Sequence, residues 1–361
     1  MKRRLPLALA LGAAFAALWF AVDSVREWRD RAWIEARIEA LRALGEPTTL
    51  EELEGPPVPD EENAFTALET IAAEISAEQR DESRRFPSRS GGGSSLLRQV
   101  QIEECLSAHP ERSSAISSAL QRKRYRAPRG STSTPLDIAK WLEFEVLAET
   151  MRDEPRASLR RALADLVELA SLPPIIQPED ALMRLMLHSV ASLALGDALE
   201  HPRVDADMVE PLLMRLAAHC PVLDPVLVVR AQRVALLQSS SRGQSTEIRS
   251  AIEDLDELEL EIRAGAKPEE LADFYELVCG AIDKTIARDH FLGIALAARR
   301  FEASERRWPQ SLKELETRLP AGWSVPQGVV LEATEQGLRL ITPLPPGRAD
   351  EPYELLLRRA R

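Results

Sequence analysis

The residues of this chain best suited to catalysis or metal binding are five histidines and three cysteines, but their spacing favours neither. Cys105, Cys220 and Cys279 lie far apart, with no CxxC pair and no histidine at ligand spacing. An exported protein could oxidise two of these thiols, and the sequence does not indicate which two. The cysteines therefore predict neither a metal centre nor a framework of disulfides.

The histidines fit structural roles better than chemical ones. His188 lies in the most apolar soluble segment, where a buried imidazole with a satisfied hydrogen bond is the expected role. His219 and Cys220 are adjacent, and neighbours on a helix point about 100° apart, so they form no dyad. The remaining histidines lie at expected helix ends or beside an acid without a third ligand: His109, His201 and His290, which follows Asp289.

No catalytic motif supplies what these residues lack. HExxH, GxSxG and P-loop patterns are absent, and Gly91–Gly93 lacks the Lys-Ser/Thr that a phosphate cradle needs. Acidic pairs are frequent on the helix expected at 247–261, but carboxylates at this spacing mostly face water. We therefore predict no catalytic, cofactor or metal residue. An enzyme whose site is assembled from scattered residues is kept as an alternative.

The charge of the chain argues against nucleic-acid binding, since the net charge is −12. It is also uneven. Residues 80–129 hold eleven basic and five acidic side chains, a balance of +6, and residues 246–276 hold three and eleven, a balance of −8. Solvated helix faces are the expected explanation, with mutual pairing or a partner as alternatives. One basic cluster is a candidate site for anionic lipid or an acidic polymer. It comprises Arg122, Lys123, Arg124, Arg126 and Arg129, beside Tyr125.

A strong signal of cellular location stands at the N-terminus. The eighteen residues Leu5–Val22 carry no charge and follow Lys2, Arg3 and Arg4. As a helix they span roughly 27 Å, close to the hydrocarbon thickness of a bilayer. The basic residues favour a cytoplasmic N-terminus and an exported body. A cleaved signal peptide is the rival, but Trp19 and Phe20 suit a membrane interface better than a cleavage site.

Beyond this run the pattern predicts a stalk and then a helical body. Residues 23–44 form a charged amphipathic helix that Gly45 and Pro47 end. The proline-rich stretch 54–59 is an extended connector, and Asp60 is the expected N-cap of a helix over 61–79. Residues 80–95 lack apolar periodicity and predict a mobile loop.

From residue 96 to about residue 306 the periodicity predicts a series of helices in antiparallel hairpins, without a recognisable repeat. Leu159, Leu163, Leu166 and Ala170 mark one buried face. The segment 179–199 has little polar surface and should lie centrally in the core, not in a membrane. The other expected helices cover 96–122, 136–152, 225–238, 248–262 with a seam of apolar residues, and a segment that Pro268 starts.

The last fifty-five residues change character. Apolar segments at 329–331 and 338–341 flank a turn containing Gly337, which predicts a β-hairpin, and residues 353–357 could add a third strand. Three short strands bury too little surface to stand alone. We therefore expect Trp308 and Leu312 to lie in a joint between this sheet and the helix at 291–301.

Three segments together carry a resemblance. They are PPVPDEENAF at 56–65, the leucine-rich helix pair at 182–218, and ALAARRFEASERRWPQSLKELETRLP at 295–320. In this order, after an N-terminal anchor, they resemble a group of uncharacterised membrane-anchored proteins common in planctomycete-type bacteria. The resemblance covers most of the chain and contains no catalytic motif. It implies an envelope location and a helical body.

A second resemblance is local. The segment RWPQSLKEL at 307–315 resembles the stretch between the long helix and the sheet of type II secretion pseudopilins. In both, an aromatic residue before proline makes a turn and SLxxL begins a short helix. Pseudopilins also begin with a Gly–Phe cleavage site and carry a Glu inside their apolar helix, and this chain has neither. The resemblance therefore implies a shared local fold.

These observations predict a mainly α protein of the cell envelope. The expected parts are an anchor at 1–22, a stalk at 23–46, a helical extracytoplasmic domain at 47–306, and a small α+β tail at 307–361. We expect a single-pass protein of the cytoplasmic membrane, with its body outside and a protein partner in the envelope. The expected function is non-enzymatic, an interaction or scaffold role. A secretion-associated role is the other alternative.

Overall fold

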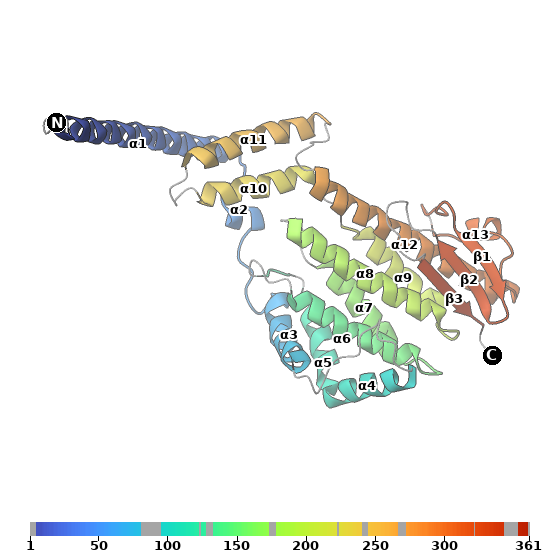
Figure 1. The fold of residues 1–361 in the computed structure, drawn as a ribbon. Coiled ribbons are helices and arrows are strands. Elements are labelled where there is room, and N and C mark those ends of the chain that lie inside the picture. Colours follow the sequence, from blue (N-terminus) through green and yellow to red (C-terminus); the bar gives the residue numbers. More distant parts are fainter. Residues whose placement is uncertain are drawn as a thin grey trace. The chain divides into compact units, whose positions relative to one another are not determined.

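A computed structural model of the chain describes most of its residues (Figure 1). The described residues are 5–80, 95–122, 124–127, 133–172, 178–221, 224–239, 245–265, 272–320, 322–342 and 353–359. Within these ranges, the side chains of 5–18, 79–80, 95–98, 178–179 and 272–279 are not described. The loop predicted at 80–95 and the start of a helix predicted at Pro268 lie almost entirely outside the described residues.

The described residues form thirteen α-helices and one three-stranded antiparallel sheet, which confirms the mainly helical fold with a small C-terminal sheet. The helices are α1 Leu5–Ala43, α2 Leu50–Glu54, α3 Ala64–Arg80, α4 Ser95–Ala108, α5 Pro110–Leu120, α6 Ser133–Thr150, α7 Ala157–Ser171, α8 Pro178–Glu200, α9 Ala206–Ala218, α10 Pro225–Ser239, α11 Ser245–Arg263, α12 Ala272–Glu305 and α13 Lys313–Glu316. The strands are β1 Val330–Thr334, β2 Gly337–Thr342 and β3 Tyr353–Arg358.

The chain divides into two compact units. The small unit joins Met1–Pro57 to Asp224–Phe274, and the large unit joins Val58–Leu223 to Tyr275–Arg361. Each unit therefore combines segments that are distant in the sequence. The small unit unites the expected stalk with a helical hairpin, α10 and α11, that the chain inserts between α9 and α12.

A single helix, α1, connects the N-terminal apolar run to the charged segment that follows it. Its end is set by Gly45, which has a φ of +72°. The amide of Gly45 donates to the Arg42 carbonyl at 2.9 Å, and the amide of Glu46 donates to the Leu41 carbonyl at 2.9 Å. These two bonds define a Schellman motif, which needs the left-handed backbone that glycine adopts without strain. The predicted stop at Gly45 is confirmed.

The C-terminal half of α1 packs beside α10 and α11 to form the small unit (Figure 1). The apolar residues between these helices come from all three of them: Ile34, Leu41, Leu237, Ile248 and Ile252. The last two belong to the predicted seam of α11, which is therefore confirmed as a buried stripe. Asp224 caps α10 by accepting the amide of Val226 at 2.9 Å, as the Asp-Pro pair predicts.

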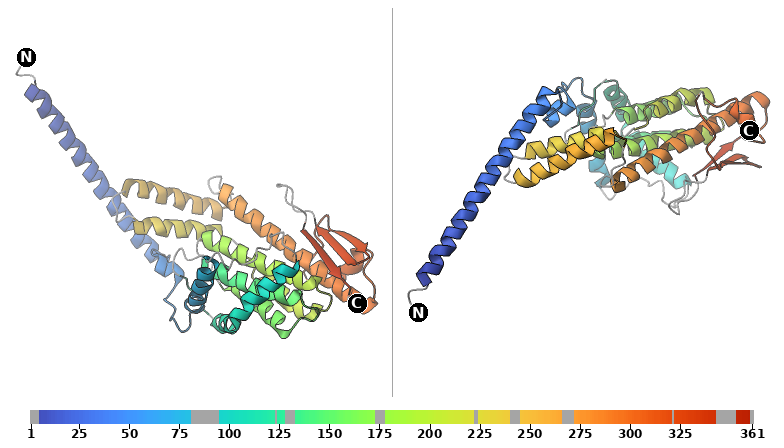
Figure 2. Two further views of the ribbon diagram at one scale, coloured as in Figure 1. Left: turned by 60° about the horizontal axis from the view of Figure 1, so that its bottom comes forward. Right: turned by 90° about the horizontal axis from the view of Figure 1, so that it is seen from above.

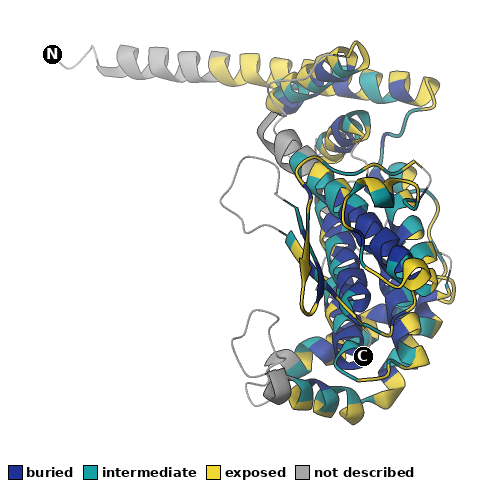
Figure 3. Ribbon diagram, turned by 90° about the vertical axis from the view of Figure 1, so that its right-hand side faces the viewer, coloured by how far each residue is buried: buried dark blue, intermediate teal, exposed yellow. Residues whose placement is uncertain are grey.

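The large unit is built around α8. This helix packs against α6, α7, α9 and β3, and α6 also packs against α3 and α4. The buried side chains line the inner faces of these helices (Figure 3), and the predicted face of α7 is fully buried. Among the residues whose side chains are described, Asp180–Glu200 is the one segment long and apolar enough to cross a membrane, and 61% of its most apolar window is buried. We assign it to the protein core, as its sequence predicts.

Two helix boundaries differ from the sequence prediction. The helix expected at 96–122 is broken into α4 and α5, because Pro110 has no amide to continue α4 and instead occupies the first position of α5. The helix expected from residue 61 begins at Ala64, and its N-cap is Asn63, not Asp60. Asp60 lies instead in the turn between Pro59 and Asn63.

Asn63 is the better cap because its side chain serves two purposes. Its Oδ1 accepts the Phe65 amide at 3.1 Å and the Arg126 amide at 3.0 Å, and its Nδ2 donates to the Arg126 carbonyl at 2.9 Å. The amide of Ala64 also donates to the Arg124 carbonyl at 2.8 Å. The start of α3 is thereby joined to a segment sixty residues later, which no local pattern could predict.

We expect Asn63→Ala to lower the free energy of unfolding by about 1–2 kcal/mol, because it removes a helix cap and the side-chain hydrogen bonds to the half-buried backbone of Arg126. Asp60→Ala is the matched control and should cost less than about 0.5 kcal/mol at its exposed position. Denaturant titration followed by circular dichroism measures both. Equal losses would show that Asp60 shares the capping role.

The sheet has strand order β1-β2-β3, and the predicted hairpin and third strand are confirmed. Thr334 pairs with Gly337 across a loop of two residues. Gly337 is required because a Cβ there would lie 2.0 Å from the Leu357 carbonyl oxygen. One face of the sheet joins the core through leucines of β2 and β3 (Figure 2): Leu338, Leu340, Leu355 and Leu357.

The edge of β3 is closed by side chains of the helical body. Glu200, at the end of α8, accepts the Leu356 amide at 2.9 Å. Arg299 of α12 donates to the Arg358 carbonyl at 2.6 Å. Such contacts satisfy edge groups that would otherwise pair with another chain. Trp308 and Leu312 pack against the same core, which confirms their predicted place between the helix and the sheet.

Candidate functional site

The described residues contain several buried polar clusters, of which one brings together a histidine, an aspartate and a serine. His188 and Ser192 lie one turn apart on α8, and Asp289 lies on α12. His188 Nε2 is 2.8 Å from Asp289 Oδ2, and the Ser192 hydroxyl donates to Asp289 Oδ1 at 2.9 Å. None of the three side chains is more than 2% exposed.

This arrangement is not that of a catalytic triad. A nucleophilic serine must give its proton to the imidazole, but here the carboxylate accepts from both the serine and the histidine. His188 Nδ1 is buried and has no hydrogen-bond partner among the described residues. We interpret the cluster as a polar contact that fixes α12 against α8. The sequence expectation of a buried structural role for His188 agrees with this geometry.

The pairing of His188 with Asp289 could not be predicted from the spacing of these residues in the sequence. Asp289 and His290 are adjacent, and the sequence offers no third ligand that would make them a metal site. The structure instead points Asp289 at His188, while His290 stacks on Trp323 with ring centroids 5.2 Å apart. The one available signal was the polar pair His188 and Ser192 at i, i+4 on an otherwise apolar helix. No group of three potential metal ligands occurs among the described residues.

The other histidines make structural contacts. His219 Nδ1 is 2.8 Å from the Arg215 carbonyl, and His201 Nε2 is 2.8 Å from the Arg152 carbonyl. His109 precedes α5 and lies 3.0 Å from Glu78. These positions agree with the helix ends that the sequence predicts.

Cys220, next to His219, is an unreactive thiol. Burial and the nearby Asp289 carboxylate together raise the pKa of Cys220 to about 11, so the thiol stays protonated at neutral pH. Neither Cys105 nor Cys220 forms a disulfide with another described residue. The side chain of Cys279 lies outside the described residues.

The basic cluster after α5 is partly engaged within the chain. Arg122 donates to the Asp60 and Asn63 carbonyls at 2.8 and 3.2 Å, and Arg124 lies 3.4 Å from Glu62. Tyr125 is buried against Phe65. Lys123 and Arg129 lie outside the described residues. The described cations thus fasten their own segment to the start of α3, so they do not form a free anion site.

Carboxylates cluster between α5, α6 and α7. Glu145 accepts from the Trp141 indole at 3.0 Å and from Arg161 at 2.9 Å, and it also bonds Ser113. Asp165 lies nearby and accepts from the Ser117 hydroxyl. Burial raises the pKa of Asp165 to about 6, although the Ser117 bond opposes the shift. Glu145 also raises it, because two neighbouring carboxylates disfavour a second negative charge.

This shift predicts a pH-dependent stability. Asp165 binds its proton more tightly in the folded chain than in the unfolded chain, where its pKa is near 3.8. Its contribution therefore favours folding at low pH and is lost as the pH rises through 6. Between pH 4 and pH 7 we expect wild type to lose about 1–2 kcal/mol relative to Asp165→Asn. Urea titrations at both pH values test this, with the exposed Asp254→Asn as control. An identical pH dependence in wild type and Asp165→Asn would contradict the prediction.

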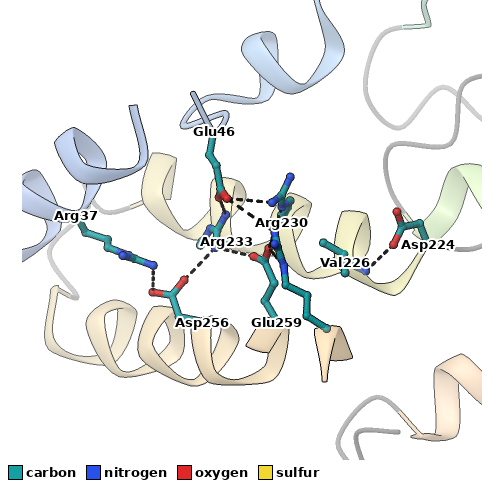
Figure 4. Close-up of polar contacts among 9 residues, drawn as sticks. Arg37, Glu46, Asp224, Val226, Arg230, Arg233, Asp256 and Glu259 are labelled. Carbon is teal, nitrogen blue, oxygen red and sulfur yellow. Dashed lines mark hydrogen bonds and ion pairs between the residues drawn. The ribbon is translucent and has the colours of Figure 1, made fainter. Parts of the chain in front are cut away.

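The densest network of ion pairs lies in the small unit and centres on Arg233 (Figure 4). The Arg233 side chain is 2% exposed. It lies 2.6 Å from Glu46, 2.9 Å from Asp256 and 2.8 Å from Glu259. Three carboxylates from two distant segments thus converge on one buried guanidinium. We call this the Arg233 network.

Further arginines complete the Arg233 network. Arg230 bridges Glu46 and Glu259 at 2.9 and 3.1 Å, and Arg37 of α1 lies 2.7 Å from Asp256. Burial alone would raise the pKa of Glu259, but hydrogen bonds from Arg263 and Arg230 outweigh it and the pKa lies below its ordinary value. The acidic charges of α11 that face α10 and α1 are therefore neutralised within the small unit.

The Arg233 network depends on how α1 ends. The Schellman motif turns the chain at Gly45 and so places Glu46 over α10, next to Arg230 and Arg233 (Figure 4). A second, smaller set of polar contacts lies at the N-terminal part of the interface between α1 and α11. Asp30, 2% exposed, accepts from Thr246 at 2.7 Å and from Arg249 at 3.1 Å. Ion pairs therefore fix α1 to α11 at both ends of their contact.

Comparisons of the chain with protein-family models, with curated proteins and with solved structures each return no match.

Proposed function

We propose that this chain is a single-pass membrane protein in which the first half of α1 spans the bilayer and the rest forms an extracytoplasmic interaction module. The observation that carries this proposal is the exposure of large apolar side chains at the end of the apolar run and just after it. The exposed fractions are 67% for Trp19, 70% for Phe20, 59% for Val22, 65% for Val25 and 72% for Trp28. Figure 3 shows this exposed stretch of α1.

Lipid is the simplest cover for these side chains. Contacts of α1 with the rest of the small unit begin at Glu27 and Asp30, so the described protein leaves residues 19–26 uncovered. A soluble protein rarely exposes a contiguous group of this size, and tryptophan is enriched where a bilayer meets water. The continuity of α1 supports the proposal further, because a helix satisfies its own backbone in lipid.

The orientation follows from the sequence. Lys2, Arg3 and Arg4 precede the apolar run, and short basic segments favour the cytoplasmic side. The body that follows would then lie outside the cytoplasmic membrane, in the cell envelope. An uncleaved anchor suits this arrangement, since α1 continues without a break from the apolar run into the small unit.

The proposed role of the body is non-enzymatic. The buried polar groups described above pair with one another within the folded chain. In the His188 cluster the Ser192 hydroxyl donates to Asp289 and not to the imidazole, which does not suit nucleophilic catalysis. The body presents many helical surfaces and a small sheet, which suits an interaction or scaffold component. The proposed partner is another protein of the envelope.

Partner capture from native membranes tests this role. The full chain is cross-linked in cells, solubilised in mild detergent and purified. A chain with residues 1–46 fused to an unrelated soluble domain serves as control. The proposal predicts a protein enriched with the full chain and absent from the control. If nothing is enriched, or if the same proteins come with both chains, the interaction role is contradicted.

A secretion-associated role is the second candidate. One observation favours it: the long helix α12 is followed by the turn at Trp308 and Pro309, the short helix α13 and then an antiparallel sheet. This is the order in which the resembling segment of pseudopilins occurs. Identification of a secretion component among the captured proteins would select this candidate.

A further inference from the structure

The position of the small unit along α1 determines how far it can stand from a membrane. Helices α1 and α11 run in the same direction, because successive contacts advance along both. Ser245 lies 3.5 Å from the Glu27 carbonyl, Thr246 bonds Asp30, and Asp256 pairs with Arg37. The N-terminal end of α11 is therefore the end nearest to the apolar run.

The distance from that end to the apolar run is short. Glu27 lies five positions after Val22, which is about 8 Å along a helix that rises 1.5 Å per residue. A bilayer adds roughly 5–8 Å of headgroup region on each side of its hydrocarbon core. Because α1 is one continuous helix, no flexible spacer lengthens this distance. The start of α11 would reach the outer boundary of the headgroups.

The side chains at this level match a phospholipid headgroup layer. Trp28 is 72% exposed. Its Cα lies about 9 Å beyond Val22 along the helix, and because side chains of a helix lean toward its N-terminus, the indole reaches back into the headgroup layer. The cations Arg26 and Arg29 are exposed beside it, with Asp23 as an exposed acid. An indole prefers the interface, and arginine binds phosphate with its planar fork.

Two of the three nearby acids, which would otherwise repel phosphate, are already paired within the chain. Glu27 bonds Arg31, and Asp30 bonds Arg249 and Thr246. The hydrogen bond from Thr246 lowers the pKa of Asp30, so Asp30 remains ionised and keeps Arg249 in place.

We propose that the small unit stands directly on the membrane, with Arg26, Trp28 and Arg29 inside the phospholipid headgroup layer and the N-terminal end of α11 against its surface. This inference rests on the proposed membrane anchor and adds the depth at which the chain leaves the lipid. The headgroup phosphates are the ligands of the two arginines. The small unit therefore keeps a fixed distance from the bilayer.

Spin labels along α1 test the inference in the full chain. Cys105, Cys220 and Cys279 are replaced by serine, and single cysteines are introduced as Phe20→Cys, Val25→Cys, Trp28→Cys and Glu39→Cys. Each protein is reconstituted in vesicles of phosphatidylethanolamine and phosphatidylglycerol, and circular dichroism verifies its fold. The accessibility of each label to oxygen, which enters lipid, and to a water-soluble nickel chelate gives its depth.

The proposal predicts a graded series. The label at 20 is reached mainly by oxygen, the label at 39 mainly by nickel, and the labels at 25 and 28 lie between them, with nickel accessibility several-fold below that at 39. Val25→Cys keeps Trp28 in place, so a change caused by losing the indole is detected. Equal nickel accessibility at 25, 28 and 39 would overturn the inference while leaving the anchor intact. Nickel access at 20 equal to that at 39 would overturn the anchor itself.

Discussion

Arg233→Met is expected to open the small unit while the large unit stays folded. Methionine has a similar length but no charge, so Glu46, Asp256 and Glu259 would be left around an apolar side chain (Figure 4). Removing one partner of a buried ion pair costs about 3–5 kcal/mol, because the remaining charges lose their compensation. Arg230 and Arg263 can neutralise only part of the three carboxylates, since both are more exposed than Arg233.

Hydrogen exchange measured by mass spectrometry locates this effect. A loss of 3 kcal/mol corresponds to exchange about 100-fold faster wherever the unit must open. We expect this acceleration in α10, in α11 and in α1 after Asp30, with no change in α7. Arg230→Met is the matched control on the same helix. Its side chain is 21% exposed, and we expect a loss of about 1 kcal/mol. Equal acceleration by the two variants would contradict a central role for Arg233.

Arg299→Met is expected to destabilise the large unit by about 2–4 kcal/mol. The Arg299 side chain is buried, and its guanidinium caps the end of α8 by donating to the Leu199, Glu200 and His201 carbonyls at 2.9, 3.0 and 3.3 Å. The last carbonyls of a helix need such donors. It also holds the edge of β3 through the Arg358 carbonyl. The substitution would remove the guanidinium donor from these four carbonyl groups, and the loss of a donor to a buried carbonyl lowers the stability of the fold.

Part of the stability that Arg299→Met loses is regained, because burying a charge is unfavourable and the variant no longer buries one. Burial lowers the pKa of Arg299 to about 10, so the guanidinium still carries its charge at neutral pH. Arg300→Met is the control at the neighbouring position, where the side chain pairs with Asp207 and Glu210 near the surface. We expect a cost below about 1 kcal/mol there. Denaturant titration with tryptophan fluorescence compares them, since Trp308 lies 5.5 Å from the Arg299 guanidinium. A similar midpoint for both variants would refute the capping role.

Local patterns predicted much of this fold. The apolar faces of α7 and α11, the Asp224 cap, the Gly45 stop and the β-hairpin at Gly337 all follow from residues close together in the sequence. Each depends on periodicity or on the backbone freedom of one residue type. These signals persist in the folded chain because the core adopts the same faces that the pattern marks.

Long-range polar contacts were not predictable in the same way. Arg233 and Glu46 are 187 positions apart, and His188 and Asp289 are 101 apart. A lone charged residue on a helix gives no indication of its partner. The same reason explains the error at Asp60, since Asn63 is preferred for its contacts with Arg126 and not for its local sequence alone.

The division into two units could not be predicted from the sequence either. Residues 23–46 and 225–263 both read as amphipathic helices, and nothing in their spacing indicates that they pack together. The charge imbalance of residues 246–276 gave a partial signal, because an acidic face needs compensation. Its main compensation comes from Arg37, Arg230 and Arg233, in the small unit itself.

The membrane anchor is the central claim, and alkaline carbonate extraction combined with intact mass measurement tests it most directly. Native membranes are washed at high pH, and the chain is weighed in the pellet and in the supernatant. An intact chain that retains Leu5–Val22 and stays in the pellet is the predicted result. A soluble chain whose N-terminus lies at or after Ala17 would contradict the anchor and leave only export.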